Sequence, residues 1–259
     1  MQTVRLGRTE LVVSRVGFGA IPIQRLNEDD AVTVIRRCLE LGVTYLDTAN
    51  AYSTSEGRIG VALQGWTKKV VLSTKTQSRT AEGVAAHLAQ SLKMMRVESI
   101  DLYQFHNVSS FPELEKILDP KGPIPVVQEA IRTGKVKHMG ITSHQIDVAK
   151  EAVKSGQVDL YVDYTSSVYY QLPDRAPVDR WAPDEVYSIV EKGLARDGIL
   201  LAGRAGFRND NVIVVPSAWA AQRNVNRISD LAPYAKDMVF GSDLVFHAAE
   251  EDGLPHVEK

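Results

Sequence analysis

Short apolar runs alternate with amphipathic segments along most of this chain. The run Val16–Ala20 is followed by Asn27, which is suited to cap a helix, and then by apolar residues at helical spacing from Ala31 to Leu39. This alternation continues toward the C-terminus. It predicts strands over 16–20, 44–48, 70–74, 100–105, 138–141, 159–164, 199–202 and 212–215, and helices over 28–39, 55–63, 80–95, 126–133, 146–154, 183–196 and 223–231.

Eight strands separated mostly by helices favour an α/β fold of the (β/α)8 TIM barrel type over an open sheet. The segment Thr3–Val13 contains two short β-like runs around a glycine-containing turn, and it predicts a β-hairpin before the first barrel strand. No linker marks a second domain. We therefore expect residues 1–259 to form a single barrel domain.

The spacing of the expected strand ends is regular in the first half of the chain and irregular in the second. The intervals from Gly19 to Asp47, to Lys75 and to His106 are 28, 28 and 31 residues, whereas Gly203 and Pro216 are only 13 residues apart. A parallel crossover needs a dozen or more residues, usually with a helix of its own. Either the helix between strands seven and eight is missing, or these strands are misassigned, or the sequence as given lacks a segment.

Composition narrows the class of protein. The chain has 259 residues, of which 44% are hydrophobic and 24% charged, and its net charge of −2 includes no basic run that would bind nucleic acid. Residues 1–13 do not resemble a signal peptide, and no apolar stretch is long enough to span a membrane. The single cysteine, Cys38, cannot form an internal disulfide. We expect a cytoplasmic monomer that binds neither nucleic acid nor membrane.

Four ionisable residues stand at or just after successive strand ends: Asp47, Tyr52, Lys75 and His106. Parallel barrel strands present these ends on one face, so the four side chains would converge on one pocket. Each also has an ordinary structural explanation, such as a turn cap for Asp47 or a solvated ammonium for Lys75. Lys75 is the most telling, because the apolar run that precedes it would bury its charge unless Asp47 pairs with it.

The segments Tyr45–Tyr52, Leu72–Thr76 and Ile100–Asn107 resemble the three signature regions of the aldo-keto reductase family. The opening Arg5–Thr9 and the run Gly17–Ala20 strengthen the resemblance. It is clear from about residue 5 to residue 152, weakens over 157–200, and returns faintly at 212–228. It implies a (β/α)8 barrel that reduces aldehydes or ketones to alcohols with a nicotinamide cofactor, usually NADPH.

The resemblance also implies a role for each of the four residues. Hydride delivery builds negative charge on the carbonyl oxygen, which must then receive a proton or strong hydrogen bonds. Tyr52 would donate the proton, and Lys75 would stabilise its phenolate form. Asp47 would hold Lys75, while His106 would bind the carbonyl oxygen and orient the substrate. None of the four would bind a metal.

Cofactor contacts follow from the same resemblance. Ser143 would bind the carboxamide beside His144, Tyr161 takes the place of a glutamine, and Arg223 would hold the 2′-phosphate. Tyr161 could instead merely pack, and Arg223 could be a solvated residue at the start of a helix. Phe207 is a candidate for stacking on the nicotinamide. The full set of expected cofactor-binding residues is Gly19, Ala20, Asp47, Ser143, His144, Tyr161, Arg204, Ser217 and Arg223.

Two other functions are compatible with these residues. Lys75 could form a Schiff base in a lyase or aldolase, or the barrel could bind a nucleotide as a sensor without turnover. An apolar pocket is expected from Ile21, Ile23, Tyr52, Phe105, Asn107 and Val108.

Overall fold

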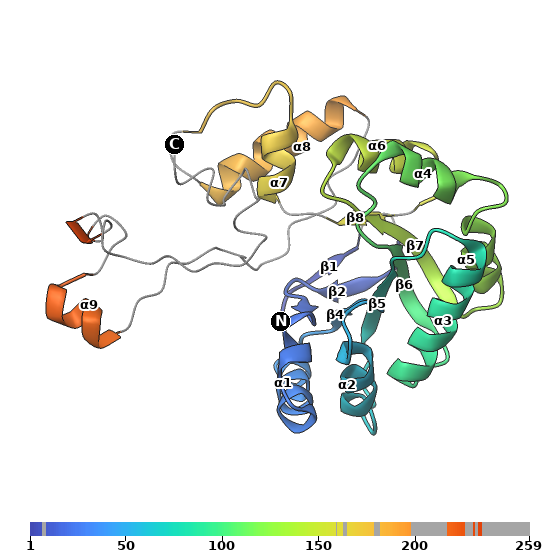
Figure 1. Ribbon diagram of the computed structural model, residues 1–259, viewed down its shortest axis with the longest axis horizontal. Coiled ribbons are helices and arrows are strands. Elements are labelled where there is room, and N and C mark those ends of the chain that lie inside the picture. The colour runs from blue at the N-terminus through green and yellow to red at the C-terminus, as the bar shows by residue number, and fades with distance from the viewer. Residues whose placement is uncertain are drawn as a thin grey trace. The chain divides into compact units, whose positions relative to one another are not determined.

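The computed structural model describes residues 1–6, 9–158, 160–162, 165–178, 182–197, 217–225, 230 and 233–234 (Figure 1). The chain divides into two compact units, Met1–Phe207 and Arg208–Lys259. The site described below lies in the first unit. Whether the whole chain forms one barrel domain stays a prediction.

A two-stranded hairpin precedes a parallel sheet, as the sequence predicts. Strands β1 (Thr3–Arg5) and β2 (Val12–Ser14) pair antiparallel. Within the described residues, the sheet then runs through six parallel strands in chain order. These strands are β3 (Phe18–Gly19), β4 (Tyr45–Asp47), β5 (Val71–Thr76), β6 (Ile100–Phe105), β7 (Val136–Thr142) and β8 (Leu160–Val162). The expected strands over 199–202 and 212–215 lie outside the described residues.

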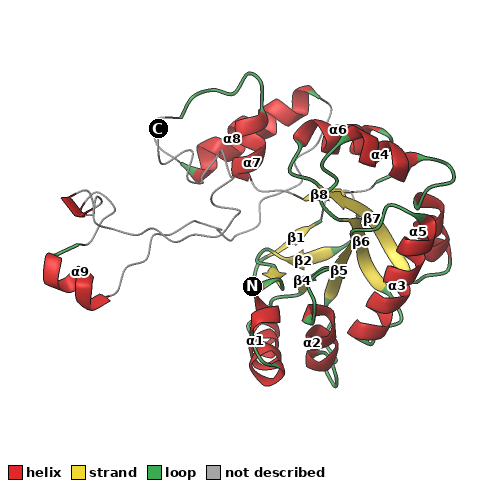
Figure 2. Cartoon of the chain, in the orientation of Figure 1, coloured by secondary structure: helices red, strands yellow, loops and turns green. Residues whose placement is uncertain are grey.

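Helices connect the strands, and most of them fall where the hydrophobic pattern predicts (Figure 2). The side chain of Asn27 accepts a hydrogen bond from the Asp30 amide and so caps the first helix, as expected. A short 3-10 helix, η1 (Pro22–Arg25), follows β3. The α-helices are α1 (Glu28–Glu40), α2 (Ser55–Ala62), α3 (Ala81–Met95), α4 (Phe111–Leu118), α5 (Ile124–Arg132), α6 (Ile146–Lys154), α7 (Thr165–Gln171), α8 (Pro183–Arg196) and α9 (Ser217–Arg223).

Three details differ from the sequence interpretation. Helix α4 was not expected, although Ser110 caps its start by accepting from the Glu113 amide. Helix α7 is also absent from the helices that the sequence predicts. Arg223 is the last residue of α9 rather than the first residue of a helix over 223–231. Helices α4 and α7 have only 8 and 7 residues, which leaves the period ambiguous, and the boundary of α9 is a local feature that periodicity does not fix.

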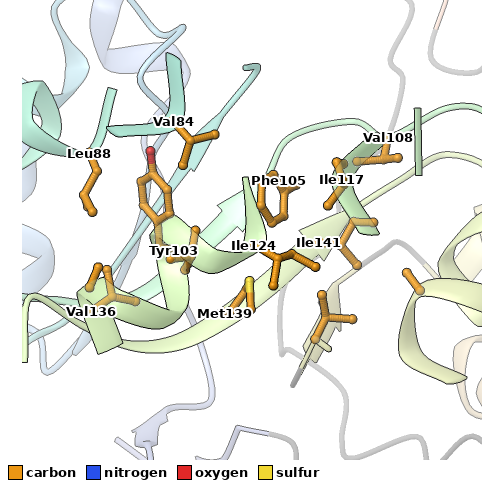
Figure 3. Packing of buried hydrophobic residues seen from close by; sticks show 14 of the residues in the cluster. Val84, Leu88, Tyr103, Phe105, Val108, Ile117, Ile124, Val136, Met139 and Ile141 are labelled. Atoms are coloured by element: carbon orange, nitrogen blue, oxygen red, sulfur yellow. The ribbon is translucent and has the colours of Figure 1, made fainter. Parts of the chain in front are cut away.

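The largest apolar core lies between the sheet and its covering helices. Figure 3 shows Tyr103 and Phe105 of β6 beside Met139 of β7 and residues of α3, and all of these side chains are buried. Val108 belongs to the same core. The expected pocket residues Phe105, Val108 and Ile23 are therefore core residues, whereas Ile21 remains exposed.

The register of the sheet brings the expected strand ends to one edge. Gly19 lies beside Asp47, Asp47 beside Ser73, and Lys75 beside Gln104. Because neighbouring parallel strands end together, side chains from β3, β4, β5 and β6 share a face without being close in sequence. Among the described helices, none is long and apolar enough to cross a bilayer.

Candidate active site

Lys75 and Asp47 form an ion pair at the edge of the sheet. The Lys75 ammonium Nζ lies 2.5 Å from Asp47 Oδ2 and also donates to the Thr48 carbonyl at 2.7 Å. The side chain of Lys75 is only 6% exposed and that of Asp47 is 27% exposed. A buried charge requires such partners, so the pairing that the sequence predicts for Lys75 is present.

Asp47 is held by polar residues on two neighbouring strands. Ser73 Oγ donates to Asp47 Oδ1 at 2.8 Å, and Gln104 Nε2 donates to Ser73 Oγ at 2.8 Å. Both Ser73 and Gln104 are buried. This series of hydrogen bonds restrains the carboxylate that pairs with Lys75. It was not predicted from the sequence. The sequence signal that could have revealed it is the presence of a polar residue, Ser73 or Gln104, within each of two buried strands.

Tyr52 and His106 complete the cluster. The Tyr52 hydroxyl oxygen and His106 Nε2 are 3.5 Å apart, and the two rings meet edge to face with centroids separated by 5.6 Å. Lys75 Nζ lies 5.3 Å from the centroid of the Tyr52 ring. The structure thus brings all four expected catalytic side chains into one cluster.

His106 is held in its neutral form. Burial lowers its pKa to about 4, and the nearby charges of Lys75, Arg79 and His144 act in the same direction, with Asp47 opposing them. A neutral imidazole can either donate or accept a hydrogen bond at Nε2. His106 can therefore bind a carbonyl oxygen without carrying a charge at neutral pH.

The loop that carries Tyr52 is anchored to the preceding strand connection. The Tyr52 amide donates to the Ala49 carbonyl at 2.9 Å, which closes a tight turn after β4. Ser55 Oγ then donates to the Ala20 carbonyl at 2.9 Å and also bonds Thr48 Oγ1 at 2.8 Å. These buried contacts give Tyr52 a defined position although it lies five residues beyond Asp47.

The expected cofactor-binding residues fall into two groups. Gly19 and Ala20 lie at the end of β3 beside Asp47, and a Cβ atom added to Gly19 would meet no atom within 4 Å. Ser143 is buried after β7, where its hydroxyl donates to the Val108 carbonyl at 2.7 Å, and His144 follows it on the surface. These four residues therefore lie at or just after the ends of strands in the same sheet.

The remaining cofactor predictions cannot be placed against this cluster. Tyr161 lies in β8 and Ser217 begins α9, but their side chains are outside the described part of the structure. Arg204 and Phe207 lie outside the described residues altogether. Arg223 belongs to the second unit, where its guanidinium lies 5.8 Å from the Tyr234 ring centroid.

Comparison with known proteins identifies relatives of the region that carries the cluster. The sequence model of the aldo/keto reductase family matches residues 15–177. L-galactose dehydrogenase of Arabidopsis thaliana is 31% identical over 177 residues, which cover 61% of this chain and 54% of the plant enzyme. NADH-specific methylglyoxal reductase of Escherichia coli is 24% identical over 261 residues, covering 83% of this chain and 78% of that enzyme.

A solved structure agrees with these matches. The aldo-keto reductase from Klebsiella pneumoniae in complex with NADPH superposes with a TM-score of 0.55 at 21% identity, covering 66% of this chain and 63% of that one. The chain thus spans about half the length of the plant enzyme and less than two thirds of the Klebsiella chain. These likenesses confirm the predicted (β/α)8 barrel as the fold class.

A second family model matches a later and overlapping part of the chain. It describes the substrate-binding domain of ABC-type glycine betaine transport systems and covers residues 99–258. Residues 99–177 are common to both matches. Beyond residue 177 only this second model applies, so Arg204, Ser217 and Arg223 stay predictions from a resemblance that the first model does not cover.

The first model alone covers the segment with Asp47, Tyr52 and Lys75, and it also contains His106. Relatives, a superposing structure and the geometry of the sheet agree with it. On these grounds the chain belongs to the aldo-keto reductase family.

Proposed function

We propose that this protein is an NADP(H)-dependent oxidoreductase that reduces aldehydes or ketones to alcohols, with Tyr52 as the proton donor. The observation that carries the proposal is the cluster in which the buried Lys75–Asp47 ion pair lies against the Tyr52 ring and Tyr52 lies against His106.

Each side chain has a task in this reaction. The neutral His106 imidazole would hydrogen-bond the carbonyl oxygen and place it near the Tyr52 hydroxyl. The Tyr52 hydroxyl would transfer its proton as negative charge develops on that oxygen. The Lys75 ammonium, held by Asp47 and the Thr48 carbonyl, would stabilise the phenolate that remains.

The described residues at this edge of the sheet are compatible with a nicotinamide ring. Gly19 is exposed, with open space where a side chain would otherwise project, so a flat ring can approach the end of β3. When bound, the cofactor would supply the hydride. Gly19, Ala20 and Asp47 lie at this end of the sheet, and Ser143 and His144 follow β7.

The cofactor is proposed as NADP(H). The Klebsiella relative is in complex with NADPH, whereas the Escherichia coli relative is NADH-specific. The expected role of Arg223 on the 2′-phosphate would favour NADPH, because a guanidinium binds phosphate in a bidentate manner. A small carbonyl or alcohol substrate and a cytoplasmic monomer remain the expectation from sequence.

The structure does not favour the Schiff-base alternative. A lysine that attacks a carbonyl must be a neutral amine. Lys75 Nζ instead donates to a carboxylate and to a backbone carbonyl, an arrangement suited to an ammonium. Trapping of substrate on Lys75 by borohydride would establish the lyase in place of the reductase.

A second candidate function comes from the match to the glycine betaine-binding domain. A cavity of about 520 Å³ lies inside the matched range and is lined by Tyr169, Tyr170, Pro173, Arg175, Pro177 and Val178. Aromatic rings can bind a quaternary ammonium by cation–π contact. However, the Arg175 guanidinium already lies 5.6 Å from both tyrosine centroids, so a cationic ligand would have to displace it. The reductase is therefore better supported.

Replacing Tyr52 by phenylalanine tests the reductase. The Tyr52→Phe variant keeps the ring but loses the proton donor, so we expect kcat for aldehyde reduction to fall by about 10²–10⁴-fold, as for loss of a general acid. Cofactor affinity, measured by fluorescence titration, should stay within a factor of about two, because the hydroxyl acts on the substrate rather than on the cofactor.

Tyr170→Phe is the matched control and should leave turnover unchanged. Retained turnover in Tyr52→Phe would remove this hydroxyl from the mechanism. Cofactor binding by the wild-type chain without turnover across a broad panel of aldehydes and ketones would select the sensor alternative.

A further inference from the structure

Arg79, in the loop between β5 and α3, reaches the segment that carries His106. Its Nη2 donates to the His106 carbonyl at 2.8 Å and to the Asn107 carbonyl at 3.3 Å. Its Nη1 donates to the carbonyl of Gln77 in its own loop at 3.1 Å. With its side chain only 15% exposed, Arg79 joins the loop after β5 to the end of β6.

Glu113 forms an ion pair with the other side of the guanidinium, without a hydrogen bond to Nε among the described residues. Glu113 Oε1 lies 3.5 Å from Arg79 Nε, and Glu113 Oε2 accepts from the Ser109 amide at 2.9 Å and from Ser109 Oγ at 3.0 Å. The backbone hydrogen bond from Ser109 lowers the pKa of Glu113, with a smaller contribution from Arg79. The carboxylate thus connects Arg79 to the turn that begins α4.

The backbone between these contacts makes a sharp change of direction. Asn107 has a φ of +50°, in the left-handed region. Thr142 of β7 holds the opposite side of the segment, because its Oγ1 accepts from the Asn107 amide and its carbonyl accepts from the Val108 amide, both at 2.8 Å. Arg79 and Thr142 therefore restrain one turn from two neighbouring connections.

The imidazole of His106 depends on that turn for its position. Its Nδ1 is buried and has no hydrogen-bond partner within the described residues. On the other side, Nε2 is 3.5 Å from the Tyr52 hydroxyl, a weak contact. With no firm hydrogen bond to either ring nitrogen in this part of the structure, the direction of the ring is set by its packing and by the backbone from which it projects.

We infer that Arg79 is a positioning residue for the proposed reaction: by holding the His106 and Asn107 carbonyls, and being held by Glu113, it directs the His106 imidazole toward the substrate carbonyl. The inference rests on the proposed function. It assigns Arg79 no contact with substrate or cofactor. Its effect on turnover therefore has to pass through His106.

A double-mutant cycle tests this dependence. Arg79→Met keeps much of the aliphatic volume but removes every N–H donor, and we expect kcat/KM for an aldehyde to fall by about 10–100-fold, in line with a small misplacement of a catalytic group. In a His106→Ala background the same substitution should change kcat/KM by less than about twofold, because coupled sites are not additive. Arg79→Lys should restore part of the activity.

The control is Arg132→Met, which breaks the exposed pair between Arg132 and Glu129 on α5. It should leave kcat/KM and NADPH affinity unchanged, and Arg79→Met should also leave NADPH affinity unchanged. Additive losses from Arg79→Met and His106→Ala, or wild-type kcat/KM in Arg79→Met, would overturn the inference.

An NMR measurement that does not depend on catalytic turnover separates this inference from the proposed function. In the chain without cofactor, the imidazole NMR signals of His106, assigned with His106→Gln, should shift or broaden in Arg79→Met and stay unchanged in Arg132→Met. Unmoved His106 signals in Arg79→Met would contradict the positioning role even if the protein proves to be a reductase. Shifted signals in a chain that reduces no carbonyl would refute the proposed reaction but keep the structural link.

Discussion

Lys75 shows how a single residue links folding to chemistry. Its charge is almost fully buried, which is tolerated because Asp47 and the Thr48 carbonyl lie within hydrogen-bond distance. Asp47 in turn depends on Ser73 and Gln104 from the next two strands. The groups proposed to act on the substrate are thus held by the same contacts that satisfy buried polar atoms.

The depressed pKa of His106 predicts a pH-dependent stability. The pKa is about 4 in the folded chain against 6.5 for the free side chain, so the unfolded state binds more protons between these values. The contribution of His106 to the free energy of unfolding should therefore be fully present above about pH 6.5 and decline as the pH falls toward 4.

Urea unfolding of the wild type and of His106→Gln, at pH values from about 7.5 down to about 4.5, measures this contribution to the free energy of unfolding. The wild type should lose more stability than the variant over that interval, since the variant lacks the titrating ring. If the free energies of unfolding of the two proteins fell in parallel with pH, the pKa of His106 would not be lowered in the folded chain.

At the scale of elements, the contact between α2 and α3 leaves no room for a side chain at Gly60. A Cβ atom added there would collide with the Met94 carbonyl oxygen and would lie 2.9 Å from the Met95 carbonyl carbon, both parts of the backbone. Gly57, one turn earlier in the same helix, faces only the flexible end of the Met94 side chain at 3.1 Å. The two glycines thus differ in what surrounds them.

We expect Gly60→Ala to destabilise the protein by about 1–3 kcal/mol, the usual range for overpacking, despite the better helix propensity of alanine. Gly57→Ala should be neutral or stabilising by up to about 1 kcal/mol, because the methionine can move and alanine favours the helix. Free energies of unfolding from urea titration give both values. Equal effects of the two substitutions would mean that the α2–α3 contact is not tight at Gly60.

Element prediction succeeded where burial imposes a strong period. Helix α6 occupies 146–154 and β6 occupies 100–105, as the apolar spacing predicts. Helices α4 and α7, with 8 and 7 residues, were missed, because apolar spacing over so short a segment does not separate a helix from a loop or strand reliably. The prediction that Arg223 begins a helix was also wrong, because Arg223 ends α9. Helix boundaries are set by local caps and turns, which the apolar spacing does not show.

At the scale of the whole molecule, two family models overlap over residues 99–177 and then diverge. The cluster of Asp47, Tyr52, Lys75 and His106 lies wholly in the part matched by the aldo/keto reductase model. The second unit, Arg208–Lys259, lies up to residue 258 in the part that only the betaine-binding model matches. The two proposed activities require different ligands, so the effect of each ligand on the melting temperature of the full chain distinguishes them.

NADPH at 100 times its dissociation constant should stabilise the chain by about 2.7 kcal/mol, which corresponds to a rise in melting temperature of roughly 5–10 °C. Glycine betaine at the same molar concentration as the NADPH should leave the melting temperature unchanged, because Arg175 lies over the two tyrosine rings that would bind it. The ligands are compared by thermal denaturation of the full chain. A rise with glycine betaine alone would favour the binding function over the reductase.

The sequence by itself determined the parallel βα order of the first unit and the four residues of the cluster, because strand periodicity and the position of Asp47, Lys75 and His106 at strand ends are local properties of the chain. Only the tertiary structure decided how these residues are held. The Ser73–Gln104 chain and the contact of Arg79 with the His106 carbonyl join residues 27 to 31 positions apart. Such contacts depend on sheet register and loop path, which no local pattern encodes.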